Sequence, residues 1–244
     1  MKTKIFTYVL LVLVLGTWGV AFAQHNQNSP ANTPPNDPQE KKNWFPTAEY
    51  NEPDLPDAAK NRLRKEKQLR HNNFKIVTSN PPEWQAETVF IGEGAMSFPA
   101  LPVRESDYIV IGTVTAAEAH LSENKKNVFS EFTVSVSKVF KTANSSIIEG
   151  SEIAVNRIGG FVKYPNGQTV LYRISGSNMP VVGERYLFFL TSKNHQDLAI
   201  LTAYAIGGAA ASPLDDSEHF QALRGLSEEA VLQKLQDLLM KSAQ

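Results

Sequence analysis

The feature that most constrains the fold of this chain is a succession of short apolar runs between residues 107 and 205, separated by turn signals. The runs are rich in β-branched and aromatic residues, which fit a pleated, partly buried surface. The first run, DYIVIGTVT, is apolar almost without interruption, as expected of a strand buried on both faces. Strands are predicted at residues 107–115, 129–136, 152–157, 161–164, 169–173, 185–191 and 198–205. The chain is therefore expected to be mainly β.

The second run alternates, with Phe132, Val134 and Val136 on one face and polar residues on the other, which predicts a half-buried strand. At residues 138–141 (KVFK) the alternation slips by one residue, which predicts a β-bulge or a strongly coiled strand. A bulge bends its strand and so allows a sheet to curl. We therefore expect residues 103–211 to form a small OB-like antiparallel barrel.

Turn chemistry predicts two strand pairs. Asn166 and Gly167 separate two apolar runs, and Asn-Gly is a strong hairpin signal because the favoured turn requires positive φ at both residues. The most hydrophobic run that follows residue 23, at 185–191, is expected to pair with residues 198–205 across a short loop.

Residues 212–244 are predicted to form a loop and a C-terminal amphipathic helix. Ser227 is the expected cap, and Glu228 and Glu229 follow it at the positive end of the helix dipole. Apolar residues recur on one face: Val231, Leu232, Leu235, Leu238 and Leu239. We expect this face to pack on the barrel rather than to bind a partner.

Residues 1–23 have the features of a secretory signal peptide. Lys2 and Lys4 precede an apolar run that ends in small residues, so cleavage between Ala23 and Gln24 is expected. The alternative is an uncleaved anchor, because the apolar segment is nearly as long as the ~20 residues of a membrane span. No basic cluster follows Ala23, which favours cleavage and export to the periplasm or the medium, with no membrane span left.

The chain contains no cysteine, which excludes disulfides, thiolate metal sites, cysteine nucleophiles and lipid attachment at the signal site. An exported domain of this kind must be held together by its apolar core. The expected mature chain carries 22 basic and 25 acidic residues, a formal charge of −3. This balance argues against a general nucleic-acid or anionic-membrane binder.

Two segments precede the predicted barrel. Residues 24–56 are rich in Asn, Pro, Gln and acids and are predicted to form a disordered linker. Docking of its one apolar pair, Trp44 and Phe45, stays open, although an incidental pair is favoured. Residues 57–102 are predicted to form a basic helix capped by Asp57, followed by an irregular segment. A phosphate or anionic-surface contact by this helix stays open, but a solvated helix is favoured because no aromatic platform accompanies it.

Residues 106–191 resemble the netrin-like and tissue-metalloprotease-inhibitor-like OB-fold domains, and similar domains in secreted bacterial proteins. The resemblance rests on residues 107–114 (DYIVIGTV), 132–141 (FTVSVSKVFK) and 182–190 (VGERYLFFL). It implies an OB fold. In the inhibitor family a disulfide-tethered N-terminal cysteine chelates the protease metal, and this chain has no cysteine. No functional residue is therefore carried over.

No motif of catalysis or metal binding is present. The histidines are His25, His71, His120, His195 and His219. None lies three or four residues from another, as helical metal motifs require, so no metal and no cofactor are expected. The acids Asp215, Asp216 and Glu218 near His219 leave a weak divalent-ion site open, although solvated acids are the favoured interpretation. Neither a Gly-x-Ser-x-Gly elbow nor a phosphate-binding Gly-rich loop occurs.

The candidate ligand-binding residues are Tyr164, Tyr172 and Arg173, which lie on or near the predicted hairpin. OB barrels bind oligomers across such strands and loops. Core packing or cross-strand pairing of these side chains is the alternative.

The preferred hypothesis is an exported, non-catalytic binding or interaction module with a protein or glycan partner of the cell envelope. A cell-envelope hydrolase with a dispersed active site is the first alternative, because such residues meet only in the fold. An inhibitor of an exported protease, suggested by the resemblance alone, is the second.

Overall fold

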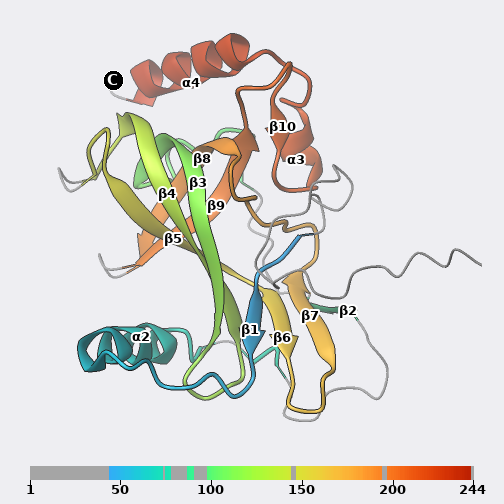
Figure 1. Cartoon of the computed structure of the whole chain (residues 1–244). Coiled ribbons are helices and arrows are strands. Elements are labelled where there is room, and N and C mark those ends of the chain that lie inside the picture. Colours follow the sequence, from blue (N-terminus) through green and yellow to red (C-terminus); the bar gives the residue numbers. More distant parts are fainter. Residues whose placement is uncertain are drawn as a thin grey trace, which may run out of the picture. The chain divides into compact units, whose positions relative to one another are not determined.

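The computed structural model describes residues 44–73, 75–77, 87–90, 98–143, 147–193 and 197–242 (Figure 1). The protein is mainly β and ends in a helix, as the sequence predicts. The predicted signal peptide, the first part of the predicted linker, and His25 and His195 lie outside the described residues.

A six-stranded sheet contains the most apolar strands, in the order β10-β9-β5-β4-β3-β8. Its members are β3 (Tyr108–Leu121), β4 (Val128–Lys141), β5 (Glu152–Ile158), β8 (Arg185–Lys193), β9 (Asp197–Ala205) and β10 (Ser212–Pro213). Strands β8 and β9 also pair with each other, antiparallel, which confirms the predicted pairing. The β5–β9 pair is parallel, through Val155 with Leu198 and Asn156 with Ala199.

A second, four-stranded sheet has the order β1-β6-β7-β2. Its members are β1 (Thr47–Glu49), β2 (Glu87–Phe90), β6 (Gly160–Lys163) and β7 (Thr169–Ile174). Strands β6 and β7 form the hairpin predicted from Asn166 and Gly167, and Gly167 has the expected positive φ of 85°. The hairpin belongs to this sheet rather than to the six-stranded sheet, so the prediction that residues 103–211 form one barrel is wrong in this part.

The linker predicted for residues 24–56 is also wrong from residue 44 onward. Phe45 is 1% exposed and Trp44 is 8% exposed, and both belong to the core cluster around β3, β4 and β8. Strand β1 follows directly and pairs in parallel with β6. The segment is polar in composition, but its one aromatic pair is buried in the core, and this burial stabilises an ordered conformation of the neighbouring residues.

Strands β3 and β4 are long and irregular, and the predicted bulge is confirmed. Val110 pairs with Val139 and Ile109 with Lys141, which leaves Phe140 as the extra residue of β4. The predicted alternation in β4 is also confirmed, because Phe132, Val134 and Val136 are buried while the residues between them are partly exposed.

The core lies on both sides of β3. Tyr108, Val110 and Val114 point into one cluster, whereas Ile109 and Ile111 point into another. The second cluster is covered by α4 (Glu228–Ser242), whose buried residues are Val231 and Leu235. The expectation that the C-terminal helix packs on the β domain is therefore confirmed. Ser227 accepts a hydrogen bond from the Ala230 amide at 3.2 Å, as a cap should. A short helix, α3 (Glu218–Gln221), precedes α4.

Gly112 provides a test of the β3–β4 packing. A Cβ at this position would overlap the Val134 side chain and lie 2.8 Å from the Ser135 carbonyl oxygen. We expect Gly112→Ala to lower the free energy of unfolding by about 1–3 kcal/mol, because a backbone atom of the neighbouring strand must move. The control is Gly208→Ala, since a Cβ there meets nothing within 4 Å. Urea denaturation measures both, and equal stability of the two variants would contradict the described register.

Candidate functional site

The basic segment forms helix α2 (Ala58–Arg70), as predicted, with Asp57 as its cap. The Asp57 carboxylate accepts hydrogen bonds from the Ala59 and Lys60 amides at 2.9 and 3.1 Å. None of the thirteen residues of α2 is buried. Its attachment to the rest of the protein therefore depends on polar contacts rather than on an apolar face.

Three cations of α2 lie three residues apart on one face, and each contacts an acid from a different part of the chain. Arg64 Nη1 lies 2.7 Å from Glu52, which precedes the helix. Lys67 Nζ lies 2.5 Å from Glu131 of β4. Arg70 donates two hydrogen bonds, of 2.5 and 2.9 Å, to Asp197 at the start of β9. We call this contact the α2 interface. The helix is solvated, as predicted, since none of its residues is buried, but acids of the same chain pair with this row of cations.

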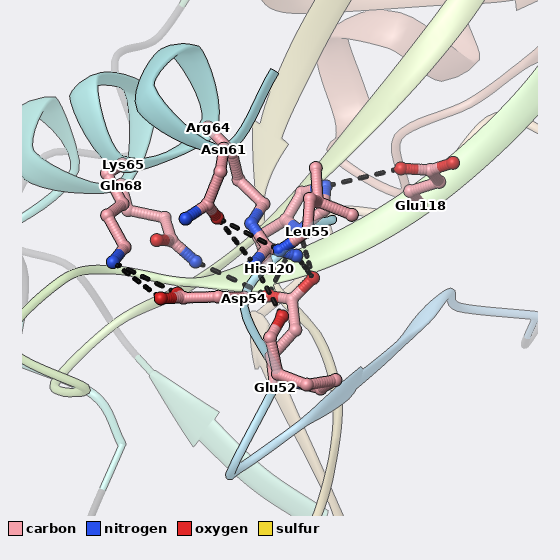
Figure 2. Close-up of polar contacts among 10 residues, drawn as sticks. Glu52, Asp54, Leu55, Asn61, Arg64, Lys65, Gln68, Glu118 and His120 are labelled. Carbon is pink, nitrogen blue, oxygen red and sulfur yellow. Dashed lines mark hydrogen bonds and ion pairs between the residues drawn. The ribbon is translucent and has the colours of Figure 1, made fainter. Parts of the chain in front are cut away.

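Glu52 contacts Arg64 and Gln68 of α2 as well as His120 of β3 (Figure 2). Its carboxylate accepts hydrogen bonds from Arg64 and, at 3.3 Å, from Gln68. It also lies 3.3 Å from Nδ1 of His120, which comes from β3. The other ring nitrogen of His120 lies 3.5 Å from Glu118. Two glutamates therefore flank one imidazole, and the Arg64 guanidinium balances part of their charge.

This arrangement changes the acid–base behaviour of His120. Burial acts to lower its pKa, but the hydrogen bonds with Glu118 and Glu52 outweigh burial and raise the pKa of His120 to about 9. The same contact holds the pKa of Glu118 below its ordinary value. His120 is therefore a charged member of the ion-pair network at neutral pH.

A second histidine of the interface behaves in the opposite way. His71, at the C-terminus of α2, stacks on the ring of Phe129 with centroids 3.8 Å apart and planes 16° apart. Burial lowers the pKa of His71, so the neutral ring is favoured. The His120 ring lies against the same Phe129, at 5.7 Å.

The structure places Tyr164 and Tyr172 in the core rather than on a binding surface. They are 3% and 1% exposed, and their hydroxyl oxygens are hydrogen-bonded to each other at 2.7 Å. Tyr50 also stacks on Tyr164. The neighbouring Arg173 is half-buried on β7. A ligand-binding role for the two tyrosines on an exposed wall is therefore wrong, and the alternative of core packing and cross-strand pairing holds.

Two of the acids near His219 contact residues elsewhere in the chain. Asp215 is buried and lies 2.5 Å from Arg157 of β5, which is itself buried. Asp216 accepts a hydrogen bond from Asn178 at 3.2 Å. In the described part of the chain, no three His, Asp or Glu side chains are grouped so that they could hold a metal ion.

Comparison with known proteins adds no family. No family model matches the chain, and no curated protein matches it. Across the ranges that the structure describes, no helix is long and apolar enough to cross a membrane.

Sequence reasoning found the helix but missed its partners. The spacing of Arg64, Lys67 and Arg70 is a signal that could have indicated one charged face. Their acids could not be assigned, because Glu131 lies 64 residues from Lys67 and Asp197 lies 127 residues from Arg70. Only the fold brings them together.

The α2 interface predicts a dependence of stability on pH. Because the pKa of His120 is raised to about 9 from 6.5, its contribution to stability is complete below about pH 6.5 and is lost as the pH rises through about 9. We expect the difference in free energy of unfolding between the native chain and His120→Gln to fall by about 2–3 kcal/mol from pH 6 to pH 10. Denaturant unfolding at each pH measures this difference. His219→Gln, at an exposed position, is the control, and a His120 difference that stays constant over this range would contradict the described contacts.

Proposed function

We propose that this chain is an exported, non-catalytic interaction module, built on an OB-type barrel, that binds a basic segment of a protein partner. The observation that carries the proposal is that α2, a helix without a buried residue, is attached to the β domain through ion pairs and hydrogen bonds. A partner segment with cations at the same spacing can form the same ion pairs, so a contact of this kind can be exchanged for one with a partner.

The order of strand pairings supports an OB-type barrel. Strand β3 pairs with β4 and β8, β4 pairs with β5, β5 pairs with β9, and β9 pairs with β8, so the pairings return to their starting strand. A cycle of five strands with one parallel pair is what a closed sheet of this kind requires. The bulge at Phe140 supplies the bend.

The position of α2 supports binding at this site. OB barrels bind ligands across their second and third strands and the loop between their first and second strands. In the proposed barrel these elements are β4, β5 and residues 122–127. Helix α2 contacts β4 through Lys67 and Glu131, and the segment after the helix contacts the loop through Asn72 and Glu123 at 3.3 Å. The helix thus occupies the surface that this class of fold uses for ligands.

The charges of that surface favour a basic protein segment over a neutral glycan. Glu118, Glu131 and Asp197 come from the β domain, and α2 meets this surface with a row of cations. A partner helix with Arg or Lys at every third position would form the same ion pairs. In the proposed function, α2 therefore occupies the acidic surface that a basic partner segment would bind.

A hydrolase is the weaker alternative. The two histidines of the α2 interface contact Glu52, Glu118 and the Phe129 ring, and within the described ranges neither ring is hydrogen-bonded to a hydroxyl. A serine nucleophile requires such a base. Inhibition of an exported protease rests on the fold resemblance alone, and a panel of metalloproteases without any binding would remove it.

Reversal of two cations tests the attachment of α2. We expect Lys67→Glu with Arg70→Glu to release the helix, because both ion pairs become repulsive and the open fraction rises about 5- to 30-fold or more. Spin labels at Leu63→Cys and Lys234→Cys report the distance from α2 to α4, and the cysteine-free chain carries no competing thiol. The distance distribution should broaden on charge reversal.

The matched control is Lys60→Glu with Arg62→Glu, which makes the same change in net charge at two exposed positions of the same helix, where the Arg62 side chain is 77% exposed. Adding Glu131→Lys and Asp197→Lys to the reversed helix should restore the narrow distribution. A synthetic peptide of residues 57–72 should then bind the Lys67→Glu, Arg70→Glu chain in a salt-dependent manner. A reversed helix that stays attached, or a released one whose chain does not bind the peptide, would contradict the proposal.

Export has its own test. The chain expressed in a cell with a secretory pathway should be recovered outside the cytoplasm with Gln24 as its first residue, because the small residues before it fit the signal peptidase. N-terminal sequencing reads this directly. Recovery with Met1 intact in a membrane fraction would favour the anchor, and the variant Ala23→Phe, which blocks cleavage at this site, is the control.

A further inference from the structure

We propose that a pocket between the segment that precedes β8 and the segment around β10 binds a peptide group that carries an apolar side chain. The pocket has a volume of about 280 Å³ and shares no residue with the α2 interface. Its lining includes Asn178, Met179, Val181, Tyr186, Pro213 and Leu214. The inference goes beyond the proposed function, because it needs neither the release of α2 nor a basic partner.

Three buried apolar residues of the surrounding core line the pocket. Met179 and Val181 are 3% and 6% exposed, and Leu214 is 8% exposed. Met179 and Leu214 belong to the main core cluster, so the floor is part of the folded interior. Small-molecule and side-chain sites have this form, with an apolar lining and a few placed polar groups.

Asn178 provides a hydrogen-bond acceptor in this pocket. It is 6% exposed, and its side-chain nitrogen donates to the Leu214 carbonyl at 2.9 Å and to Asp216 at 3.2 Å. Two acceptors on the nitrogen fix the orientation of the amide. Within the described residues no hydrogen bond to its carbonyl oxygen, Oδ1, is found, and this oxygen is not one of the fully buried unpaired polar atoms, so it is an accessible acceptor in the pocket lining.

Tyr186 provides a hydrogen-bond donor. It is 4% exposed, and its hydroxyl oxygen accepts the Val181 amide hydrogen at 3.1 Å. No acceptor for the hydroxyl hydrogen is found in the described part of the chain. Burial raises the pKa of Tyr186 to about 12, so the group keeps this hydrogen at any physiological pH.

A ligand that satisfies both groups must donate to Asn178 and accept from Tyr186. A secondary amide does both, through its N–H and its C=O. Each hydrogen bond to a polar group of the pocket contributes to the binding free energy. A ligand that bonds to both Asn178 and Tyr186 should therefore bind more tightly than a ligand that bonds to only one of them. The apolar floor favours a peptide with an apolar side chain over a sugar, which would bring further hydroxyls into an apolar surface.

The charged groups at the edge of the pocket are Glu184, Asp216 and Arg224. The edge thus carries both signs, which suits the backbone of an extended peptide rather than a strongly charged ion. The site resembles those that hold one residue of a bound segment, and its volume lies near the lower end for small ligands.

Titration of the 15N-labelled chain with N-acetyl-leucine amide tests the site. We expect saturable shifts of the Met179, Val181 and Leu214 amides, with a dissociation constant on the order of 1 mM for a ligand of this size. N-acetyl-N-methyl-leucine dimethylamide, which keeps the side chain and both carbonyls but has no N–H, should bind at least threefold more weakly. Methyl β-glucoside tests the sugar alternative. Equal or tighter binding of either comparator would overturn the choice of ligand.

Two variants locate the binding to this pocket. Ala205→Leu fills the pocket from β9 and should weaken binding at least tenfold, whereas Ala199→Leu, a half-buried residue of the same strand that does not line the pocket, should leave it unchanged. Tyr186→Phe removes the donor and should weaken binding about fivefold, which provides a second measurement if Ala205→Leu does not fold. Absence of saturable shifts in the native chain, or equal binding by Ala205→Leu and Ala199→Leu, would overturn the proposal.

Discussion

The structure depends on the burial of β3 on both of its faces. Ile109, Val110 and Ile111 are each 0% exposed, and they alternate between the cluster that contains Phe132 and Phe188 and the cluster that α4 covers. Strand β8 alternates between the same two clusters, with Phe188 and Leu190 in the first and Leu187 and Phe189 in the second. The chain has no cysteine and so no disulfide, and the packing of these strands links the sheet interior to the C-terminal helix.

The parts of the fold that could be predicted are those fixed by neighbours in sequence. Asp57 and Ser227 cap their helices because a cap needs only the next two or three amides. Gly167 forms its turn because the position requires a positive φ, which glycine adopts without steric cost. This depends on the residue itself and not on a distant partner. Strand β1 was missed because its stabilisation comes from Phe161 and β6, more than a hundred residues away, and no local pattern reports a parallel partner. For the same reason, the sequence did not indicate that the β6–β7 hairpin belongs to a second sheet, since its other partners, β1 and β2, are distant in sequence.

The α2 interface shows how a local pattern can be correct and its interpretation incomplete. Lys67 and Arg70 do lie on a solvent-accessible helix, as the charge density indicates, but their side chains are only 34% and 27% exposed because acids of β4 and β9 meet them. His120 joins this network with a raised pKa, while His71 keeps a lowered one, although both rings lie against Phe129. The difference is that two carboxylates contact His120, whereas burial dominates for His71. Identity and exposure of the residue are therefore insufficient to set its charge.

The tyrosines show why the candidate binding residues were chosen wrongly. The sequence of a strand does not reveal whether the hydroxyl of a tyrosine is hydrogen-bonded within the protein or is available to a ligand. Tyr164 and Tyr172 are hydrogen-bonded to each other within the core. Tyr186 is also buried, but its hydroxyl accepts a hydrogen bond from a backbone amide and the residue lines a pocket. The donors and acceptors around a tyrosine oxygen are therefore set by the fold, here by the meeting of β8 with the segment before it.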